Sequence, residues 1–319
     1  MKRILALVAA TVLAGAAAAQ GAFPSRPIRM IVPFTAGSVT DIIARTVADS
    51  MSKGLGQPVI IENRPGAGGT IGAAQVAKSE ADGYTVLIHS SGHALNPAIY
   101  PNLPYDTVKD LTGVTPIAAV PNVLVVSPAR GWKSVADMVA AAKARPGQMN
   151  YASAGSGSAT HMNAEKFKLG AGIDAVHVPF KGTPEAITDV IGGRNDWFFA
   201  PMATALPLIK DGKLQALAVS SAQRSPSLPN VPTTVEAGVP GSDYTLWVGL
   251  IVPSATPAPI VRRLHDETLK ALAAADVKAR LASLGADAFT MEPAAFNAYI
   301  KTEMESAAVI AKTANLKAQ

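Results

Sequence analysis

The sequence predicts an α/β protein of two lobes, and three observations support this fold class. Strand-like and helix-like stretches alternate along the chain, a pattern typical of largely parallel sheets with helices between the strands. Two strand–loop–helix units, far apart in the chain, each place a Gly/Ser-rich loop directly before the helix. Two apolar strands, at residues 123–126 and 247–252, are placed to lead the chain out of a first lobe and back into it. This arrangement indicates a hinge between the lobes.

The first lobe, expected at residues 23–122 and 247–319, begins with strands. Three stretches rich in apolar and β-branched residues predict them, at residues 28–34, 58–61 and 84–88. A helix from about Val39 follows the first strand, and its apolar face consists of Ile43, Val47 and Met51. A glycine-rich loop and a short helix through Lys78 lead from the second strand to the third. Residues 96–106 contain three prolines, which predicts an irregular surface segment.

The second lobe is expected at residues 123–246. Four further stretches predict its strands, at residues 149–153, 176–178, 196–199 and 214–219. Ser134 and Asp137 form a capping box at the start of one helix, and Thr183 with Pro184 begins another. Residues 224–243 contain four prolines and little periodicity, as expected for a loop that returns to the hinge. Three helices after residue 256 complete the first lobe.

Residues 1–19 are typical of an export signal. Lys2 and Arg3 form a charged start, residues 4–19 are almost entirely small or apolar, and residues 17–19 match an A-x-A cleavage site. We expect cleavage near Ala19 and a periplasmic mature protein; the alternative, an uncleaved anchor, has an apolar stretch that is short for a membrane span. Loss of Lys2 and Arg3 leaves 26 of 28 basic residues against 23 acidic ones, an excess that does not indicate nucleic-acid binding.

Familiar catalytic and cofactor motifs are missing, which argues against an enzyme. The chain has no Cys, so disulfides and cysteine metal ligands are excluded. It has no G-x-S-x-G or P-loop motif, and the dinucleotide-like start at Gly155 and Gly157 lacks its third glycine because Thr160 stands there. His89 and His93 lack an accompanying metal-binding carboxylate pattern. We therefore expect no catalytic residue, no cofactor and no metal.

The two Gly/Ser-rich loops are the candidate ligand site. A helix N-terminus carries unpaired N–H groups and a partial positive charge, and small residues let an anion approach closely. Ser90 and Ser91 end the third strand beside the first loop and are expected to donate hydroxyl hydrogen bonds. The candidate residues of the two loops are Phe34, Thr35, Ala36, Gly37 and Ser38 in the first, and Ser156, Gly157, Ser158, Thr160 and His161 in the second. Together the loops predict two lobes that grip one anionic ligand.

Two charged residues near the loops each have two alternative roles. Asp41 lies in the first turn of the first helix, where it is either a partner of the helix dipole or a polar wall of the cleft. A carboxylate beside an anion site repels the ligand unless a water or a donor lies between them. Lys181 is either a solvated charge or a ligand contact. Aromatic residues make up only 5% of the chain, so a sugar, which usually stacks on aromatic rings, is a less expected ligand.

Several motifs together resemble the Bug-type solute receptors of tripartite tricarboxylate transporters. They are R-P-I-R (26–29) with V-P-F (32–34), N-R-P-G-A-G-G (63–69) with I-G-A (71–73), L-P-Y-D (103–106), G-S-G-S (155–158) with His161, H-V-P-F-K-G (177–182), and L-P-N-V-P-T (228–233) with E-A-G (236–238). The resemblance covers nearly all of the mature chain. It implies a type II periplasmic-binding fold, the two-lobed Venus flytrap, with two mixed, mostly parallel sheets and hinge crossovers. It also implies a small carboxylate ligand held by backbone N–H groups, hydroxyls and bridging waters.

The chain departs from the family pattern at two places. Ser38 replaces the second glycine of the family's Ala-Gly-Gly, which either adds a hydroxyl donor or narrows the pocket. Phe180 replaces a family Tyr and loses its phenolic donor. The family's Asp is kept at Asp196, where it faces the cleft or caps a strand. These departures make the identity of the ligand less transferable.

The function expected from the sequence is capture of a small organic carboxylate in the periplasm. The ligand is a mono- or dicarboxylate, aliphatic or aromatic, that a monomeric receptor delivers to integral-membrane permease subunits. One alternative is a ligand-sensing subunit for a periplasmic two-component signalling system. Another is an exported hydrolase, although no nucleophile–base pair is recognisable in the sequence.

Overall fold

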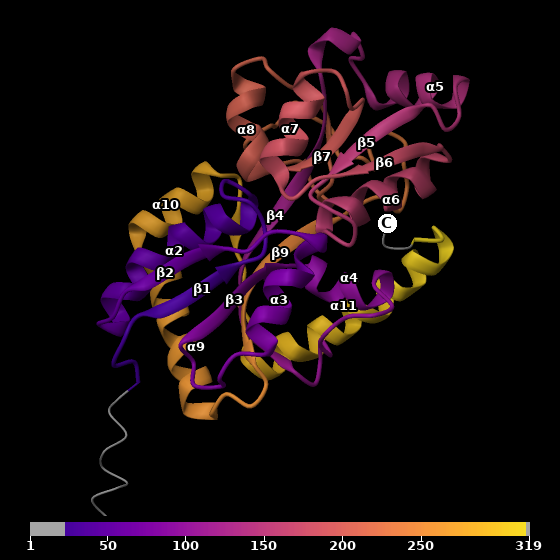
Figure 1. The fold of residues 1–319 in the computed structure, drawn as a ribbon. Coiled ribbons are helices and arrows are strands. Elements are labelled where there is room, and N and C mark those ends of the chain that lie inside the picture. The colour runs from indigo at the N-terminus through magenta and orange to yellow at the C-terminus, as the bar shows by residue number, and fades with distance from the viewer. Residues whose placement is uncertain (1–22, 317–319) are drawn as a thin grey trace, which may run out of the picture.

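A computed structural model describes residues 23–316, which form two lobes joined by two long strands (Figure 1). The predicted export signal at residues 1–19, with its cleavage near Ala19, lies outside the described residues. No helix within residues 23–316 is long and apolar enough to cross a membrane. The lower lobe in Figure 1 is called lobe 1 and the upper lobe is called lobe 2.

Lobe 1 is a mixed sheet with helices on both faces. Its strands are β1 (Ile28–Val32), β2 (Val59–Asn63), β3 (Thr85–Ser90), β9 (Thr245–Pro253), β10 (Asp287–Ala288) and the first part of β4 (Leu111–Val126). Its helices are α2 (Val39–Leu55), the short η1 (Ala67–Gly69), α3 (Thr70–Ala77), α4 (Gly92–Ile99), α9 (Ala258–Ala273), α10 (Ala275–Ser283) and α11 (Pro293–Thr313). Strand β1 pairs in parallel with β2 and β3, which places the loops after these strands at one edge of the sheet.

Lobe 2 repeats this construction on a smaller scale. Its strands are β5 (Met149–Ser153), β6 (Ala175–Pro179), β7 (Trp197–Pro201), β8 (Gln215–Val219) and the last part of β4. Its helices are the short η2 (Pro128–Arg130), α5 (Val135–Ala144), α6 (Ala159–Ala171), α7 (Thr183–Ile191) and α8 (Met202–Lys210). Strand β5 pairs in parallel with β6 and β7, and the capping box predicted at Ser134 and Asp137 is confirmed at α5.

Strand β4 belongs to both lobes. Up to Pro121 it pairs with β9, and from Asn122 it pairs with β7 and β8. Most strands therefore form one continuous path of pairing, in the order β2-β1-β3-β9-β4-β7-β5-β6, and β8 and β10 pair with β4 beside this path. We place the hinge at this change of partners; the lobe boundaries at residues 122 and 247 stay a prediction.

The crossing strands make the sheets less parallel than expected. The outer strands pair in parallel, but β4 and β9 are antiparallel to every strand they contact. The reason is geometric, because one crossing strand leaves lobe 1 and the other returns to it. The sheets are thus mixed, as predicted, with a smaller parallel share than the sequence pattern indicated.

Two helices were not predicted from the sequence. The expected irregular segment at 96–106 was wrong at its start, because residues up to Ile99 belong to α4 despite Pro97 inside the helix. Proline lacks an N–H and costs a helix one hydrogen bond, but burial of Ala94, Leu95 and Ile99 favours the helix over its local propensity. Helix α8 likewise contains Pro207 and had no predicted counterpart.

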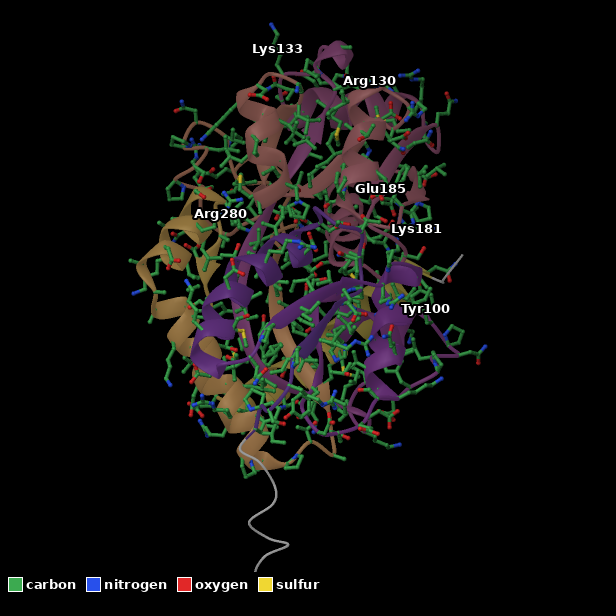
Figure 2. The ribbon with its side chains drawn as sticks, turned by 60° about the vertical axis from the view of Figure 1, so that its left-hand side comes forward. Tyr100, Arg130, Lys133, Lys181, Glu185 and Arg280 are labelled. Atoms are coloured by element: carbon green, nitrogen blue, oxygen red, sulfur yellow. The ribbon has the colours of Figure 1, made fainter. Side chains whose placement is uncertain are left out.

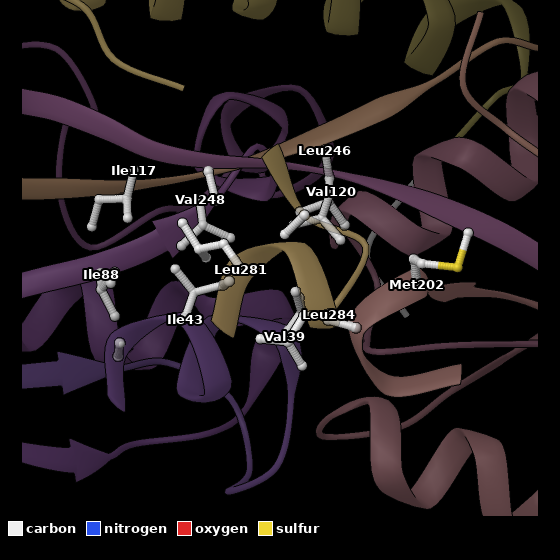
Figure 3. Close-up of a cluster of buried hydrophobic side chains, with 14 of the residues drawn as sticks. Val39, Ile43, Ile88, Ile117, Val120, Met202, Leu246, Val248, Leu281 and Leu284 are labelled. Atoms are coloured by element: carbon white, nitrogen blue, oxygen red, sulfur yellow. The ribbon is translucent and has the colours of Figure 1, made fainter. Parts of the chain in front are cut away.

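The main hydrophobic core lies beneath the two Gly/Ser-rich loops and continues across the hinge. These loops are called the first and the second ligand loop, in chain order. Figure 3 shows side chains of α2, α10 and the crossing strands in one cluster, together with Met202 of lobe 2. Val39 at the start of α2 packs in this cluster with Leu246 of β9. Full burial of a side chain of this size contributes about 1.5–3 kcal/mol, so this packing holds the start of α2 firmly against the hinge.

Candidate functional site

The two Gly/Ser-rich loops have the same backbone construction. Each contains Gly-Ser-X-Thr, at residues 37–40 and 157–160. The glycines Gly37 and Gly157 have left-handed φ values of +81° and +76°, and the serine after each is the extended N-cap of a helix. Helices α2 and α6 begin at the next residue, as predicted. Both helix N-termini therefore point their free N–H groups toward the space between the lobes.

The N–H groups of the glycine and the serine in each Gly-Ser-X-Thr stretch are already occupied. The Gly37 N–H donates to Asp41 Oδ2 at 2.9 Å, and the Gly157 N–H donates to His161 Nδ1 at 3.2 Å. The N–H groups of Ser38 and Ser158 donate to carbonyls within their own loops. These four N–H groups are therefore not free for a ligand, which narrows the donor set that the sequence indicated; side-chain hydroxyls and the first N–H groups of the helices remain among the possible donors.

Asp41 fixes the first loop from within lobe 1. Its carboxylate accepts from Gly37, from Arg45 through Nε and Nη2 at 3.0 Å each, and from Asn63 Nδ2 at 2.9 Å. Burial raises the pKa of this carboxyl, but the hydrogen bonds from Arg45, Gly37 and Asn63 together hold the pKa below its usual value. Of the two roles open to Asp41, the structure supports the partner of the helix start.

His161 fixes the second loop as a neutral acceptor. Its ring stacks on His177 with 4.0 Å between ring centroids. Burial, with smaller contributions from His177 and Lys168, holds the pKa of His161 well below its usual value. The unprotonated Nδ1 can then accept from Gly157. The predicted ligand residue His161 thus has an internal partner and positions its loop.

A small cavity lies between the two helix starts. Its volume is about 20 Å³, room for one or two waters. Its lining comes from both lobes: Phe34, Ser38, Val39, Thr40, Ser90, Ala154, Ser158, Ala159, Thr160, Thr183 and Leu246. None of these side chains is charged, so the cavity offers an anion hydroxyls and helix N-termini.

Two threonines of this cavity were missed by the sequence analysis. Thr40 of lobe 1 and Thr183 of lobe 2 are buried, and neither hydroxyl has a hydrogen-bond partner within residues 23–316. A buried polar group without a partner is costly unless a ligand or water satisfies it. The shared Gly-Ser-X-Thr pattern was the signal for Thr40; no local signal marks Thr183, which reaches the cavity through the packing of the lobes.

The lobes touch each other across this site. The Thr183 N–H donates to Ser38 Oγ at 3.2 Å, and the Thr35 hydroxyl donates to Glu185 Oε2 at 3.0 Å. Gly182 lies so close that a Cβ there would overlap Thr35 and Ser38. The hydroxyl that Ser38 adds to the family pattern is thus used in contact between the lobes.

Comparison with known proteins identifies the family. Residues 43–316 match the sequence model described as the tripartite tricarboxylate transporter family receptor. The chain belongs to this family. The receptor is 36% identical to Protein BugT of Bordetella pertussis, over 99% of each chain. It also resembles the solved periplasmic binding protein BugD, with 32% identity, a TM-score of 0.89 and coverage of 93% of this chain and 100% of that one. The Bug-type resemblance and the two-lobed fold are confirmed.

Two solved relatives of the receptor have organic acids in their descriptions. One is R. palustris Rpa4515 with adipate, 35% identical with a TM-score of 0.89, covering 92% of this chain and 99% of that one. The other is MatC of Rhodopseudomonas palustris with bound malate, 33% identical with a TM-score of 0.86, covering 90% and 99%. Adipate and malate are thus the acids named for these two relatives.

Several predicted residues of the receptor lie outside the small cavity. Ser91 pairs its hydroxyl with that of Tyr244 at 2.8 Å and lines a separate hollow of about 370 Å³ behind the site. Ser156 and Lys181 line an outer hollow of about 460 Å³ at the mouth between the lobes. In Figure 2, Lys181 lies near Glu185 of lobe 2, above Tyr100 of lobe 1. Ala36 is exposed on the first loop.

Asp196 is remote from the loops of the receptor. Its carboxylate binds Arg130 Nη2 at 2.7 Å and accepts from the Asn150 N–H at 2.7 Å, at the start of β7. Figure 2 shows Arg130 at the outer end of lobe 2, away from Tyr100 and Lys181. The prediction of Asp196 as a ligand residue is therefore not supported, and its other role, capping the strand, is the one that the contacts support.

Two buried histidines of lobe 1 lie close to each other. His89 ends β3 and His93 belongs to α4, with 5.6 Å between ring centroids. Burial lowers the pKa of His89 to about 4 and that of His93 to about 3. Within residues 23–316 the receptor has no group of three or more His, Cys, Asp or Glu side chains that could hold a metal ion.

Proposed function

We propose that this chain is a periplasmic solute-binding receptor that closes its two lobes around a small organic carboxylate. The observation that carries the proposal is the neutral cavity between the starts of α2 and α6, with unpartnered hydroxyls of Thr40 and Thr183 on opposite sides. A carboxylate group placed there meets hydroxyl donors and two positive helix ends at once. No cation is needed for its capture.

The energetics of this arrangement favour moderate affinity. Hydrogen bonds to a charged group contribute about 1.5–3 kcal/mol each. Several of them must offset an association cost of at least about 4 kcal/mol, which leaves roughly −8 kcal/mol, or micromolar binding. Closure removes water from the site and strengthens each of these bonds.

The ligand class is a short aliphatic mono- or dicarboxylate, with aromatic acids as the second choice. Adipate and malate in the two solved relatives support this class. The outer hollow beside Lys181 offers room for the remainder of a dicarboxylate. We further propose export by the segment at residues 1–19, no catalytic activity, and delivery of the ligand to permease subunits by a monomer. The lobes of the receptor are residues 23–122 with 247–319, and residues 123–246.

A thermal-shift screen tests the proposal directly. The ligand-free mature protein is scanned with mono-, di- and tricarboxylic, aromatic and amino acids, each beside its matching amide. A ligand at 100 times its dissociation constant stabilises the folded state by about 2.7 kcal/mol, which is readily seen. A shift with an acid that disappears with its amide supports carboxylate capture. No shift with any acid would refute the proposed ligand class.

The variants Thr40→Val and Thr183→Val assign the binding to this cavity. Valine has the shape of threonine but no hydroxyl, so each change removes one donor and leaves the packing in place. Each is expected to weaken binding of the acid found in the screen by about tenfold, the loss of one charge-assisted hydrogen bond. The matched control Thr256→Val removes another unpartnered buried hydroxyl, one that does not line the cavity, and should leave the affinity unchanged.

A further inference from the structure

One face of α4 packs against the second ligand loop from the opposite lobe. Gly92, Asn96 and Tyr100 are four residues apart, so they share one side of the helix and its C-cap. The loop they meet, residues 155–158, belongs to lobe 2. This contact therefore crosses the space between the lobes, although none of the three residues lines the small cavity.

Each of the three residues makes a defined contact with the loop. The Tyr100 hydroxyl donates to the Ser156 carbonyl at 2.8 Å. The Asn96 side chain faces two carbonyls, so its amide nitrogen is placed toward them, 3.2 Å from Gly157 O and 3.3 Å from Gly92 O. A Cβ on Gly92 would lie 3.1 Å from the same Gly157 O, so the loop approaches the helix as closely as a glycine allows.

We propose that Tyr100 and Asn96 are positioning residues for ligand capture, which latch the second ligand loop to lobe 1 when the lobes close. The latch is assigned from contacts alone; its role in capture rests on the proposed function. The carbonyls of Ser156 and Gly157 can reach these donors only when lobe 2 is folded down on α4. Each bond therefore stabilises the closed form over the open one.

The latch also orients the loop. The C=O and N–H of one trans peptide point in opposite directions. With its carbonyl held by Tyr100, the peptide from Ser156 to Gly157 directs its N–H at His161 Nδ1. With its carbonyl held by Asn96, the next peptide directs the Ser158 N–H at Gly155 O. The loop is thus held from lobe 1 by its carbonyls and from lobe 2 by its N–H groups.

Tyr100 can serve as this donor over a wide pH range. Burial raises the pKa of its hydroxyl above the usual value, so the group keeps its proton. Its ring lies at the outer hollow, below Lys181 and Glu185 in Figure 2. Removal of the hydroxyl leaves every side chain of the small cavity in place, which separates the latch from direct ligand contact.

The distance between the lobes in the ligand-free protein tests the latch. The chain has no Cys, so Lys53→Cys in α2 and Lys143→Cys in α5 place one spin label on each lobe at exposed positions. The distance distribution, measured by electron paramagnetic resonance, reports the ratio of closed to open molecules. Tyr100→Phe and Asn96→Ala are each expected to lower this ratio threefold to tenfold, the loss of one net hydrogen bond.

Two further variants separate the latch from a structural effect. Gly92→Ala adds only a methyl group at the contact, in a helix that prefers alanine, and is expected to lower the closed population while the melting temperature holds or rises. Tyr84→Phe is the matched control, because its hydroxyl accepts from the Ser25 N–H within lobe 1. It should leave the distances unchanged.

The outcomes decide between the proposals. The latch is overturned if the wild type has no closed population, or if Tyr100→Phe and Gly92→Ala leave it unchanged. The same variants should release the acid found in the screen threefold to tenfold faster, with an unchanged association rate. If no acid binds the wild type, the proposed function is refuted. The distance measurement without ligand still tests the latch independently.

Discussion

The first and second ligand loops share a backbone but are held by different side chains. In each, the glycine N–H is accepted by the side chain four residues later, Asp41 in lobe 1 and His161 in lobe 2. Asp41 is a charged acceptor bound to Arg45 and Asn63, whereas His161 is a neutral ring stacked on His177. The loop geometry therefore needs only an acceptor at this position, and the chemistry of that acceptor is free to differ.

The hydroxyls of the two loops differ in the same way. Ser158 Oγ accepts from the His161 N–H and caps its own helix, whereas Ser38 Oγ makes no cap and accepts from Thr183 of the other lobe. Thr160 accepts from the Ala154 N–H, whereas the Thr40 hydroxyl has no partner within residues 23–316. The hydroxyls of Ser158 and Thr160 are therefore paired within lobe 2, whereas Ser38 pairs with the other lobe and the Thr40 hydroxyl is left for the proposed ligand.

Alanine at the two loop glycines should have unequal effects. Gly157→Ala combines left-handed strain with a Cβ 2.7 Å from Asn96 and 3.0 Å from Tyr100. Strain and overpacking together are expected to cost about 2–5 kcal/mol of unfolding free energy and to prevent closure. Gly37→Ala meets no atom nearer than 3.5 Å, so strain alone should cost about 1–2 kcal/mol. Urea unfolding of both variants measures the difference, and equal losses would contradict the asymmetry.

Acid should destabilise the second loop before the first. The folded pKa of His161 and His177 lies below 6.5, so the unfolded chain takes up protons first and stability falls as pH drops below 6.5. For His177, with a pKa of about 4, the loss between pH 7 and 5 is about 2 kcal/mol, and buried His89 and His93 add to it. Asp41 contributes a loss only below about pH 4.

Hydrogen exchange resolved by segment checks this order. Residues 154–161 should lose more protection between pH 6.5 and 5, after correction for the intrinsic rate, than residues 35–41. Uniform loss across both loops would show that the histidine pair does not act locally. The variant His177→Gln should remove much of the pH dependence of the unfolding free energy.

Removal of the charge of Asp41, which holds the first ligand loop, should cost less unfolding free energy than Gly157→Ala. Asp41→Asn keeps an acceptor for the Gly37 N–H but gives up the charged bonds to Arg45, an expected loss of about 1–2 kcal/mol. Chemical denaturation at pH 7 and at low and high salt measures it. The loss should shrink little with salt, because the carboxylate is buried; full suppression by salt would mean that the pair acts as an ordinary surface ion pair.

The smallest stability change is expected at the cavity threonines. Their hydroxyls have no partner, so Thr40→Val and Thr183→Val should leave the ligand-free melting temperature unchanged or slightly higher. The matched variant Thr160→Val removes a hydroxyl that accepts from the Ala154 N–H. It should lower the unfolding free energy by about 1 kcal/mol, and the melting temperature with it. Melting curves without ligand distinguish the three variants, and a clear loss at Thr40 would mean that its hydroxyl is already satisfied.

Local signals in the sequence were sufficient to predict where the helix after each ligand loop begins. A Gly/Ser-rich loop directly after a strand gave the helix starts at Val39 and Ala159 correctly. The same signals pointed to Ser38, Ser158 and Thr160, which line the cavity. These features depend on neighbours within a few residues, which a single sequence displays.

Features that depend on packing between distant segments were not predictable. Thr183 reaches the cavity only because lobe 2 folds onto Ser38, and α4 forms against the signal of Pro97 because its apolar side is buried. The roles of Asp41 and Asp196 were open for the same reason. Each carboxylate pairs with an arginine, Arg45 on the same helix for Asp41 and Arg130 on another element for Asp196, and these contacts favour a structural role.

Strand β4, which has 16 residues and serves both lobes, has a consequence for modular exchange. A domain that can be exchanged between relatives ends where its own hydrogen bonds end, but one interior strand of lobe 2 comes from a segment that begins as part of lobe 1. A chimera made from two receptors must therefore cut within a hydrogen-bonded strand, at Pro121 and Asn122, and match the register on both sides. Ligand preference in this receptor is for that reason expected to evolve by substitution in the loops and not by wholesale replacement of a lobe.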